Sequence, residues 1–346
     1  MLLIDFSLQI AHRVDEVGSQ AWDRLSGDRS LASYRWYRFA ETVLTNDKAF
    51  YIIVLDQAQP IGRATLWLTW QEPLPVASPL ARRVMEAVLR RRPLLVCRTP
   101  LSSVSGLILP NPPLHTAALA AIIQAAQELM RQHHASALMF DYLTHDEAQW
   151  ASWPPAFGTV AMPQPGTCLD ITWPDFDSYL HQLPKSVQKD YRRHRNRAAD
   201  LGVVITSDRV PPPASEALML IRNVERHHHT SPHPLTEAIL HNSGAIDGTW
   251  LKATIESRLV GCGLLAGEGG VRFLTLLGLD YEVQYVYFQL FYAAIRCAIE
   301  EGVRVLRGGT SAYEIKQRLG FRLDDNNYVS YVANGRLMNW IARRMT

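Results

Sequence analysis

The sequence predicts an α/β protein, of the α+β kind, with two similar units that each contain a mixed, mostly antiparallel sheet flanked by helices. Its 346 residues exceed one ordinary domain and suit two. Both halves alternate strand patterns with helical patterns. A segment rich in Pro and Gly separates the halves at 150–165. We therefore expect an N-terminal domain at 1–165 and a C-terminal domain at 166–346.

The composition is that of a folded globular protein, with 47% hydrophobic and 20% charged residues. A net charge of +2 excludes a general polyanion binder, so phosphate contacts must come from a local patch. The four cysteines form no C-x-x-C pair, which excludes a typical zinc site or disulfide framework. No apolar run reaches the roughly 18 residues of a membrane span. We expect a cytoplasmic monomer or dimer with reduced thiols.

The first half is predicted as a mixed sheet with helices. Period-two patterns indicate its strands, and three- and four-residue apolar spacing indicates its helices, most clearly at 114–135. The predicted strands are 2–10, 50–55, 61–70, 94–98 and 137–143, and the predicted helices are 20–25, 34–44, 78–91 and 114–135.

The second half repeats this alternation around an antiparallel meander. Short turns at 256–258 and 268–270 join the three meander strands. A strongly periodic helix follows, and Gly302 suits its C-terminal cap. In order, the predicted elements are strand 167–172, basic helix 176–201, strand 203–206, helices 216–228 and 235–242, strands 249–257, 258–268 and 270–280, helix 286–302, strand 303–308, helix 311–320, strand 326–333 and a terminal helix with a basic end.

The most unusual local feature is the basic segment LPKSVQKDYRRHRNRAADLG. At about 100° per residue, one face of this helix presents cations and the opposite face is apolar. Guanidinium and ammonium groups on one face can hold the phosphates of a tRNA, a nucleotide sugar or CoA. The alternative is an ordinary solvated helix face. The candidate phosphate-binding residues are Lys185, Lys189, Arg192 and Arg193.

A second motif, GGTSAYEIKQRLGF, joins a strand to a helix near the end of the chain. We expect Thr310 or Ser311 to cap the helix, with Glu314 near its third position as in a capping box. Gly, Ser, Leu and Phe of this motif are explained by local structure alone. Tyr313 and Lys316, three residues apart on one helical face, exceed that requirement and are candidate catalytic residues.

Together with EEGVRVLRGGT, these motifs and the element order resemble the GNAT acyltransferase fold, in its FemABX-like branch with BioF2-like acetyltransferase domains. The resemblance covers about residues 166–335, and the first half is similar to a degenerate partner unit. It implies transfer of an acyl group to an amine without a covalent enzyme intermediate. It also implies that Lys316 lies in the acyl-transfer centre, where a cation can stabilise an oxyanion.

The donor implied by this resemblance is an acyl-CoA or an aminoacyl-tRNA, used as a co-substrate, with no tightly bound cofactor. An ordinary GNAT protein has a glycine-containing loop before its central helix, where backbone N–H groups hold the CoA pyrophosphate. Here that place reads EVQYVYFQ and has no glycine. The bulky Tyr285 and Tyr287 hinder such an approach and instead line a substrate wall. We therefore favour aminoacyl-tRNA over acyl-CoA.

The acceptor is expected to be an amine of a small molecule, peptide or sugar, in cell-wall, exopolysaccharide or natural-product assembly. Asp280, at the end of a meander strand, is the candidate proton acceptor, although Asp is also common as a turn residue. Arg222, or one of the histidines His227, His228, His229 and His233, is a candidate lining residue of the acceptor site. The run ERHHHTSPH lacks an i, i+4 histidine pair, so we expect no metal. The rival interpretation is a non-catalytic module that binds nucleic acid or phosphate.

Overall fold

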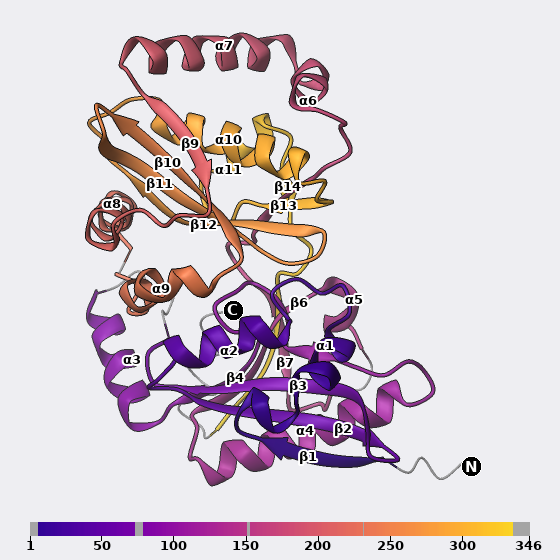
Figure 1. Ribbon diagram of the computed structural model, residues 1–346. Helices are drawn as coiled ribbons and strands as arrows, with labels where there is room; N and C mark the ends of the chain where they lie inside the picture. The colour runs from indigo at the N-terminus through magenta and orange to yellow at the C-terminus, as the bar shows by residue number, and fades with distance from the viewer. Residues whose placement is uncertain (1–5, 73–78, 151–152, 231, 335–346) are drawn as a thin grey trace. The chain divides into compact units, whose positions relative to one another are not determined.

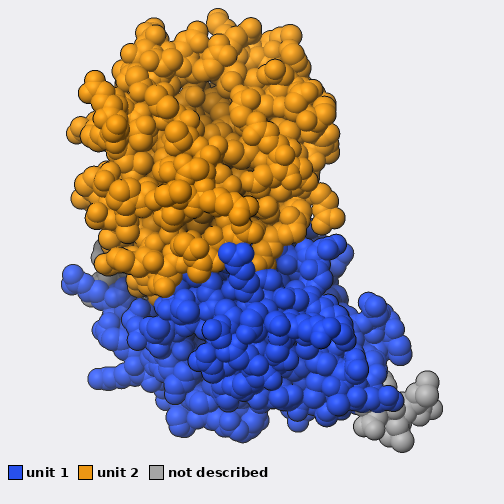
Figure 2. Space-filling view, in the orientation of Figure 1, with its two compact units in different colours: residues 1–163, 325–346 blue, residues 164–324 orange. Residues whose placement is uncertain are grey.

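The computed structural model describes residues 6–72, 79–150, 153–230 and 232–334. The chain forms two compact units, the first of residues 1–163 and 325–346 and the second of residues 164–324, which Figure 2 colours separately. The first break lies close to the expected boundary at 165. The predicted strand at 326–333, assigned from sequence to the second unit, instead belongs to the first, because it pairs with two strands there.

The first unit contains, within its described residues, an eight-stranded sheet in the order β1-β2-β3-β4-β6-β15-β7, with β5 paired to β3 (Figure 1). Only β4 and β6 pair in parallel, and the other pairs are antiparallel. The mixed, mostly antiparallel sheet predicted from sequence is therefore confirmed. The strands are β1 (Ser7–Ala11), β2 (Lys48–Asp56), β3 (Gln59–Thr69), β4 (Leu94–Cys97), β5 (Leu107–Ile108), β6 (Ala137–Leu143), β7 (Gly158–Ala161) and β15 (Tyr328–Ala333).

Side chains alternate between the two faces of this sheet. Along β3, Leu66 and Leu68 join the apolar cluster formed with α4, whereas Arg63 faces the other way. The Arg63 guanidinium lies over the ring of Trp22 in α1, 3.9 Å from its centroid. Helices therefore cover both faces. They are α1 (Ser19–Ser26), α2 (Tyr34–Val43), α3 (Pro79–Arg91), α4 (His115–Gln132) and α5 (His145–Ala148), with a 3-10 turn at Val14–Glu16.

The second unit contains, in the part of the chain that is described, a seven-stranded sheet in the order β14-β8-β13-β12-β11-β10-β9. Its centre is the predicted meander, and β12 and β13 form its one parallel pair. This second mixed sheet also agrees with the sequence prediction. The strands are β8 (Thr167–Asp170), β9 (Val204–Asp208), β10 (Gly248–Ile255), β11 (Arg258–Ala266), β12 (Val271–Leu279), β13 (Val305–Arg307) and β14 (Arg322–Leu323).

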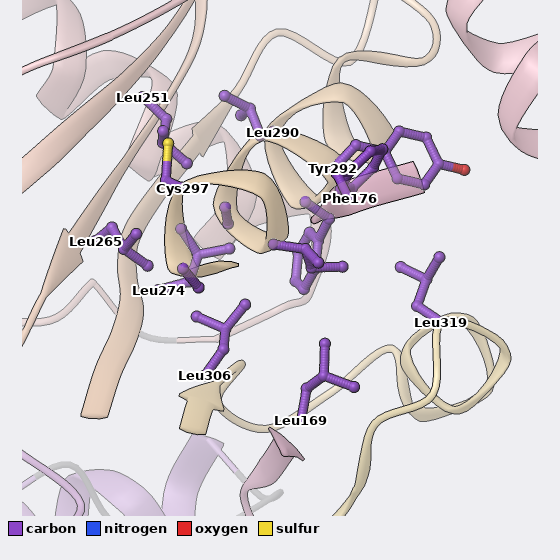
Figure 3. Packing of buried hydrophobic residues seen from close by; sticks show 14 of the residues in the cluster. Leu169, Phe176, Leu251, Leu265, Leu274, Leu290, Tyr292, Cys297, Leu306 and Leu319 are labelled. Carbon is purple, nitrogen blue, oxygen red and sulfur yellow. The ribbon is translucent and has the colours of Figure 1, made fainter. Parts of the chain in front are cut away.

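The core of this unit is built around α10, whose apolar face packs on the meander (Figure 3). Leu290 of α10 and Leu251 and Leu265 of the sheet are fully buried in this cluster. A separate cluster joins α8 and α9 to Trp250 and Leu264 on the other face. The helices are α6 (Phe176–Gln182), α7 (Lys185–Asp200), α8 (Ala214–His227), α9 (Thr236–Asn242), α10 (Val286–Glu300) and α11 (Tyr313–Arg318), with a 3-10 turn at Ser243–Ala245.

The predicted single helix at 176–201 is two helices, α6 and α7. The break falls at Leu183 and Pro184, both of which have extended backbone, with ψ of 155° and 145°. Proline has no N–H to continue the hydrogen-bond ladder, and it disfavours helical backbone in the residue before it. The basic helix therefore starts at Lys185. The predicted terminal helix lies outside the described residues.

Close packing of α8 on β12 predicts the effect of one substitution. A Cβ at Gly278 would lie 2.8 Å from Leu220 Cβ and 2.9 Å from the Ile221 backbone nitrogen. Gly278→Ala is expected to lower the free energy of unfolding by about 1–3 kcal/mol through overpacking, measured by urea denaturation. Gly244→Ala, with nothing within 4 Å of its new Cβ, is the matched control and should change stability by less than about 0.5 kcal/mol. Equal effects of the two variants would contradict this packing.

Candidate functional site

The parallel strands β12 and β13 separate after a short paired segment. Three residue pairs are in register, from Val271–Val305 to Phe273–Arg307. Beyond them β12 continues to Leu279, whereas the chain after β13 turns away at Gly308. A register shift opposite Cys262 and Leu264 accompanies a left-handed Leu276 in β12, with φ of 50°. We call this place the strand fork, defined by 274–279 on one side and 308–312 on the other.

The chain at 308–312 has an unusual backbone. Gly309, Ser311 and Ala312 all have left-handed φ, of 69°, 70° and 46°. Two adjacent non-glycine residues in this region cost free energy, on the order of 1–3 kcal/mol each. Such a conformation persists only where other contacts hold it. We call 308–312 the corner.

Three donors converge on one carbonyl oxygen of the corner. Gly309 O accepts the backbone N–H of Thr167 at 3.0 Å, the Thr167 hydroxyl at 2.8 Å and the Lys316 ammonium at 3.2 Å. The Gly308 N–H in turn donates to Thr167 O at 2.8 Å. Thr167 is fully buried. These bonds hold the left-handed residues in place.

The expected helix cap is not formed. The helix begins at Tyr313, and its N-cap residue is Ala312, which makes no side-chain capping bond. Neither Thr310 nor Ser311 caps it, because the left-handed corner displaces both from the cap position. The predicted capping box with Glu314 is therefore wrong.

Lys316 is buried, with only 2% of its surface exposed. Its Nζ donates to Gly309 O at 3.2 Å and to Thr310 O at 2.9 Å, and it lies 5.9 Å from the ring centroid of Phe291. Burial lowers the pKa of Lys316 to about 8. Among the described residues the ammonium has carbonyl acceptors and no carboxylate within ion-pair distance. These two acceptors use two of the three N–H bonds of the ammonium.

Tyr313 anchors the corner to the start of the unit. Its hydroxyl donates to Pro165 O at 2.8 Å, and burial raises the pKa of Tyr313. The phenol therefore stays protonated at neutral pH. Tyr313 thus binds Pro165 at the start of the unit, whereas Lys316 binds Gly309 and Thr310 in the corner.

Asp280 follows β12 directly, on the other side of the strand fork. One carboxylate oxygen lies 2.9 Å from Arg258 Nη1, and the other accepts the Glu282 backbone N–H at 3.1 Å. Both oxygens are therefore engaged. This arrangement favours Asp280 as the residue that fixes the turn into α10.

Tyr285 is the N-cap residue of α10 and has left-handed backbone, with φ of 69°. Its ring lies 5.5 Å from the imidazole of His194, which stacks on Phe288 at 4.0 Å. Burial raises the pKa of Tyr287, whose hydroxyl is buried without a hydrogen-bond partner among the described residues. A left-handed residue here is the conformation that glycine favours. Tyr285 therefore has a glycine-like backbone conformation, and its ring packs in a group with those of His194 and Phe288.

The basic face predicted on α7 is present. Lys185, Lys189, Arg192 and Arg193 are exposed, while Val187 and Ala198 are buried. Arg193 forms an ion pair with Asp190 at 2.8 Å, and Arg318 of α11 pairs with the same carboxylate. The Asp190–Arg318 pair joins α7 to the helix that carries Lys316.

His194, on the buried face of α7, is a residue that sequence reasoning missed. Its Nδ1 lies 3.1 Å from the Tyr292 hydroxyl, and only 7% of its surface is exposed. Burial, followed by the charge of Arg193, lowers the pKa of His194. Its i+7 spacing from the buried Val187 was the available signal.

Arg222 is held within α8 and the loop after it. Its Nη1 lies 2.7 Å from Glu225 Oε2 and 3.4 Å from the carbonyl oxygen of His233. Its guanidinium is thus already paired. In the described part of the chain, no group of three or more His, Cys, Asp or Glu side chains is arranged to hold a metal ion.

A family profile described as FemAB-like, peptidoglycan biosynthesis/recognition, matches residues 13–345. This match spans both units. The chain belongs to the FemAB-like family. It is accordingly an acyltransferase of the GNAT fold.

Solved structures share the fold of this FemAB-like chain at low identity. FemX is 14% identical with a TM-score of 0.65, and the match covers 96% of this chain and 99% of FemX. A tandem GNAT protein from the clavulanic acid biosynthesis pathway, described as without AcCoA, is 13% identical with a TM-score of 0.55, covering 96% and 99%. L-PGS from Bacillus licheniformis is 11% identical with a TM-score of 0.55, covering 97% and 98%. Curated protein sequences yield no match.

The FemAB-like chain shows no helix, within its described residues, with the length and hydropathy needed to cross a bilayer. Its four cysteines are all buried and free of disulfides.

The buried ammonium predicts how stability depends on pH in this FemAB-like protein. The folded-state pKa of Lys316, about 8, lies below the ordinary 10.5. The cost of burying the charge is therefore fully present below pH 8, and it is relieved as pH rises towards 10.5 because the folded state releases its proton first. Relative to Lys316→Met, the wild-type protein should gain up to about 3 kcal/mol between these pH values, measured by urea denaturation. A pH-independent difference would contradict a lowered pKa.

Proposed function

We propose that this acyltransferase transfers an aminoacyl or acyl group from a carrier to an amine by direct attack at the strand fork of the second unit. The amine nitrogen forms a bond to the donor carbonyl carbon, giving a tetrahedral oxyanion. The bond from that carbon to the carrier oxygen then breaks, and the amine proton ends on the departing hydroxyl. With CoA as the carrier, the departing group is a thiol.

The observation that carries this proposal is the isolated cation of Lys316. Its ammonium is buried, lacks a carboxylate partner among the described residues and has one N–H bond to spare. A desolvated cation stabilises a developing oxyanion more strongly than one in water. Tyr313 has a positioning role through Pro165 O. Positioning of donor and amine supplies the rest of the acceleration.

For the donor, we favour aminoacyl-tRNA over acyl-CoA. Tyr285 occupies the left-handed position at the start of α10, and its ring packs beside His194 where a glycine would leave the backbone N–H groups open. The exposed cations of α7 offer phosphate contacts on a separate helix. One fold neighbour is a tandem GNAT protein described by reference to AcCoA, which keeps acyl-CoA as the second candidate.

For the acceptor, we propose an amine of a peptide, sugar or small molecule. The family description, peptidoglycan biosynthesis/recognition, supports an acceptor related to the cell wall. Both candidate donors are cytoplasmic molecules, and we propose that compartment for the reaction.

Removing the Lys316 charge tests the catalytic assignment. Lys316→Met keeps an unbranched side chain of similar length. It should lower the single-turnover transfer rate by about 10²- to 10³-fold, by analogy with loss of one oxyanion donor. The rate should also fall above pH 8 in the wild-type protein, as the ammonium loses its proton. Lys48→Met, an exposed lysine of the first unit, is the matched control. An unchanged transfer rate in a folded Lys316→Met protein would exclude the assignment.

Neutralising the basic face tests the tRNA donor. A triple variant, Lys185→Gln, Lys189→Gln and Arg192→Gln, should weaken tRNA binding and reduce the slope of log K against log salt by about 2–3. Arg90→Gln, Arg91→Gln and Arg92→Gln together remove the same charge from the exposed C-terminal end of α3 and serve as the control.

The result also separates the enzyme from a binding module. A module that only binds nucleic acid should lose affinity in the α7 variant and show no transfer in any variant. Tight CoA binding, together with no salt-sensitive tRNA binding by the wild-type protein, would reverse the preferred donor.

A further inference from the structure

Two stacked rings, those of Tyr281 and His227, lie at the end of β12, next to Asp280. Tyr281 follows Asp280, and its ring stacks on the imidazole of His227, the last residue of α8. The ring centroids are 3.9 Å apart and the planes differ by 15°. Tyr281 nevertheless remains 41% exposed. The pair therefore presents aromatic surface that the fold itself does not cover.

Two regular elements hold this pair. Gly278 lies against Leu220 and Ile221 of α8, and Asn223 Nδ2 donates to Leu279 O at 3.2 Å. Successive contacts thus follow α8 and β12 to their ends. His227 is the last residue of α8, and Tyr281 lies two residues after the end of β12. Their stacked rings therefore continue the packing of α8 on β12.

A third imidazole lies beside the stacked rings. His228 lies edge-on to His227, with centroids 5.2 Å apart. Its pKa is lowered first by burial and then by the charges of His227, His229 and Lys316. An exposed aromatic ring is a surface on which a nucleic-acid base can stack.

We propose that the Tyr281–His227 pair is a stacking site for the adenine base of the acyl donor. This inference rests on the proposed function, because adenosine is present both at the 3′ end of tRNA and in CoA. The base stacks on the exposed ring of Tyr281. The acyl end of the donor is then directed to the strand fork, where Lys316 lies.

Binding of four probes tests the stacking site. The first two are a short oligoribonucleotide ending in CCA and the same chain with an abasic 3′ nucleotide. The other two are CoA and 4′-phosphopantetheine, which lacks the nucleotide. The wild-type protein should prefer the base-containing member of one pair, and that pair identifies the donor. Tyr281→Ala should remove the preference, about 5- to 150-fold in Kd, and Tyr281→Phe should retain it.

His227→Ala should weaken the same preference, and His241→Ala, at an exposed histidine of α9, is its control and should leave every Kd unchanged. The inference is overturned if the wild-type protein does not distinguish base from abasic probe in either pair. It is also overturned if Tyr281→Ala keeps the full preference. Acyl transfer is scored separately: transfer without base-dependent binding rejects the stacking site alone, whereas base-dependent binding without transfer from either donor rejects the proposed function.

Discussion

The second unit depends on the carbonyl oxygen of Gly309, on which Thr167 and Lys316 converge with three donors. Those bonds hold a corner with two adjacent left-handed residues that carry side chains, Ser311 and Ala312. The same bonds place the Lys316 ammonium against the carbonyl groups of Gly309 and Thr310. Burial lowers the pKa of Lys316, and the free energy that maintains the strained corner comes from the packed sheet and α10.

Much of the fold could be predicted from apolar spacing. The periodicity of α10 and the turns of the meander are local signals. Pro184 is another, because a proline there predicts the break between α6 and α7 that the expected single helix at 176–201 lacked. The corner was not readable, since Ser and Ala rarely adopt left-handed backbone and tertiary contacts impose it here. The pattern of β15 indicated a strand but not its sheet, because pairing partners are non-local. The resemblance identified Lys316 as a site residue. The two carbonyl groups that bind its ammonium and the stacking of Tyr281 on His227 are visible only in the structure.

The charged groups that lie beyond the parallel strand pair differ between the two units. In the first unit β4 and β6 are in register through Cys97–Phe140, and the next residues are Arg98 and Asp141. Arg98 lies 3.7 Å from Asp141 and 2.5 Å from Glu72, so its guanidinium is shared between carboxylates. In the second unit, beyond β12 and β13, the Lys316 ammonium donates to two carbonyl oxygens. Among the described residues, the Lys316 ammonium has no carboxylate partner, unlike the Arg98 guanidinium, which supports the proposal that the chemistry belongs to the second unit.

The return of β15 to the first sheet affects how the chain is made. β15 lies between β6 and β7, so β7 has no neighbour in that sheet until residues 328–333 have been synthesised. The intervening 164–324 form a complete unit of their own. During translation the later-encoded unit can therefore finish folding before the earlier one, which must wait with an unpaired strand edge. That interval is when the nascent protein is most exposed to mispairing and to chaperones.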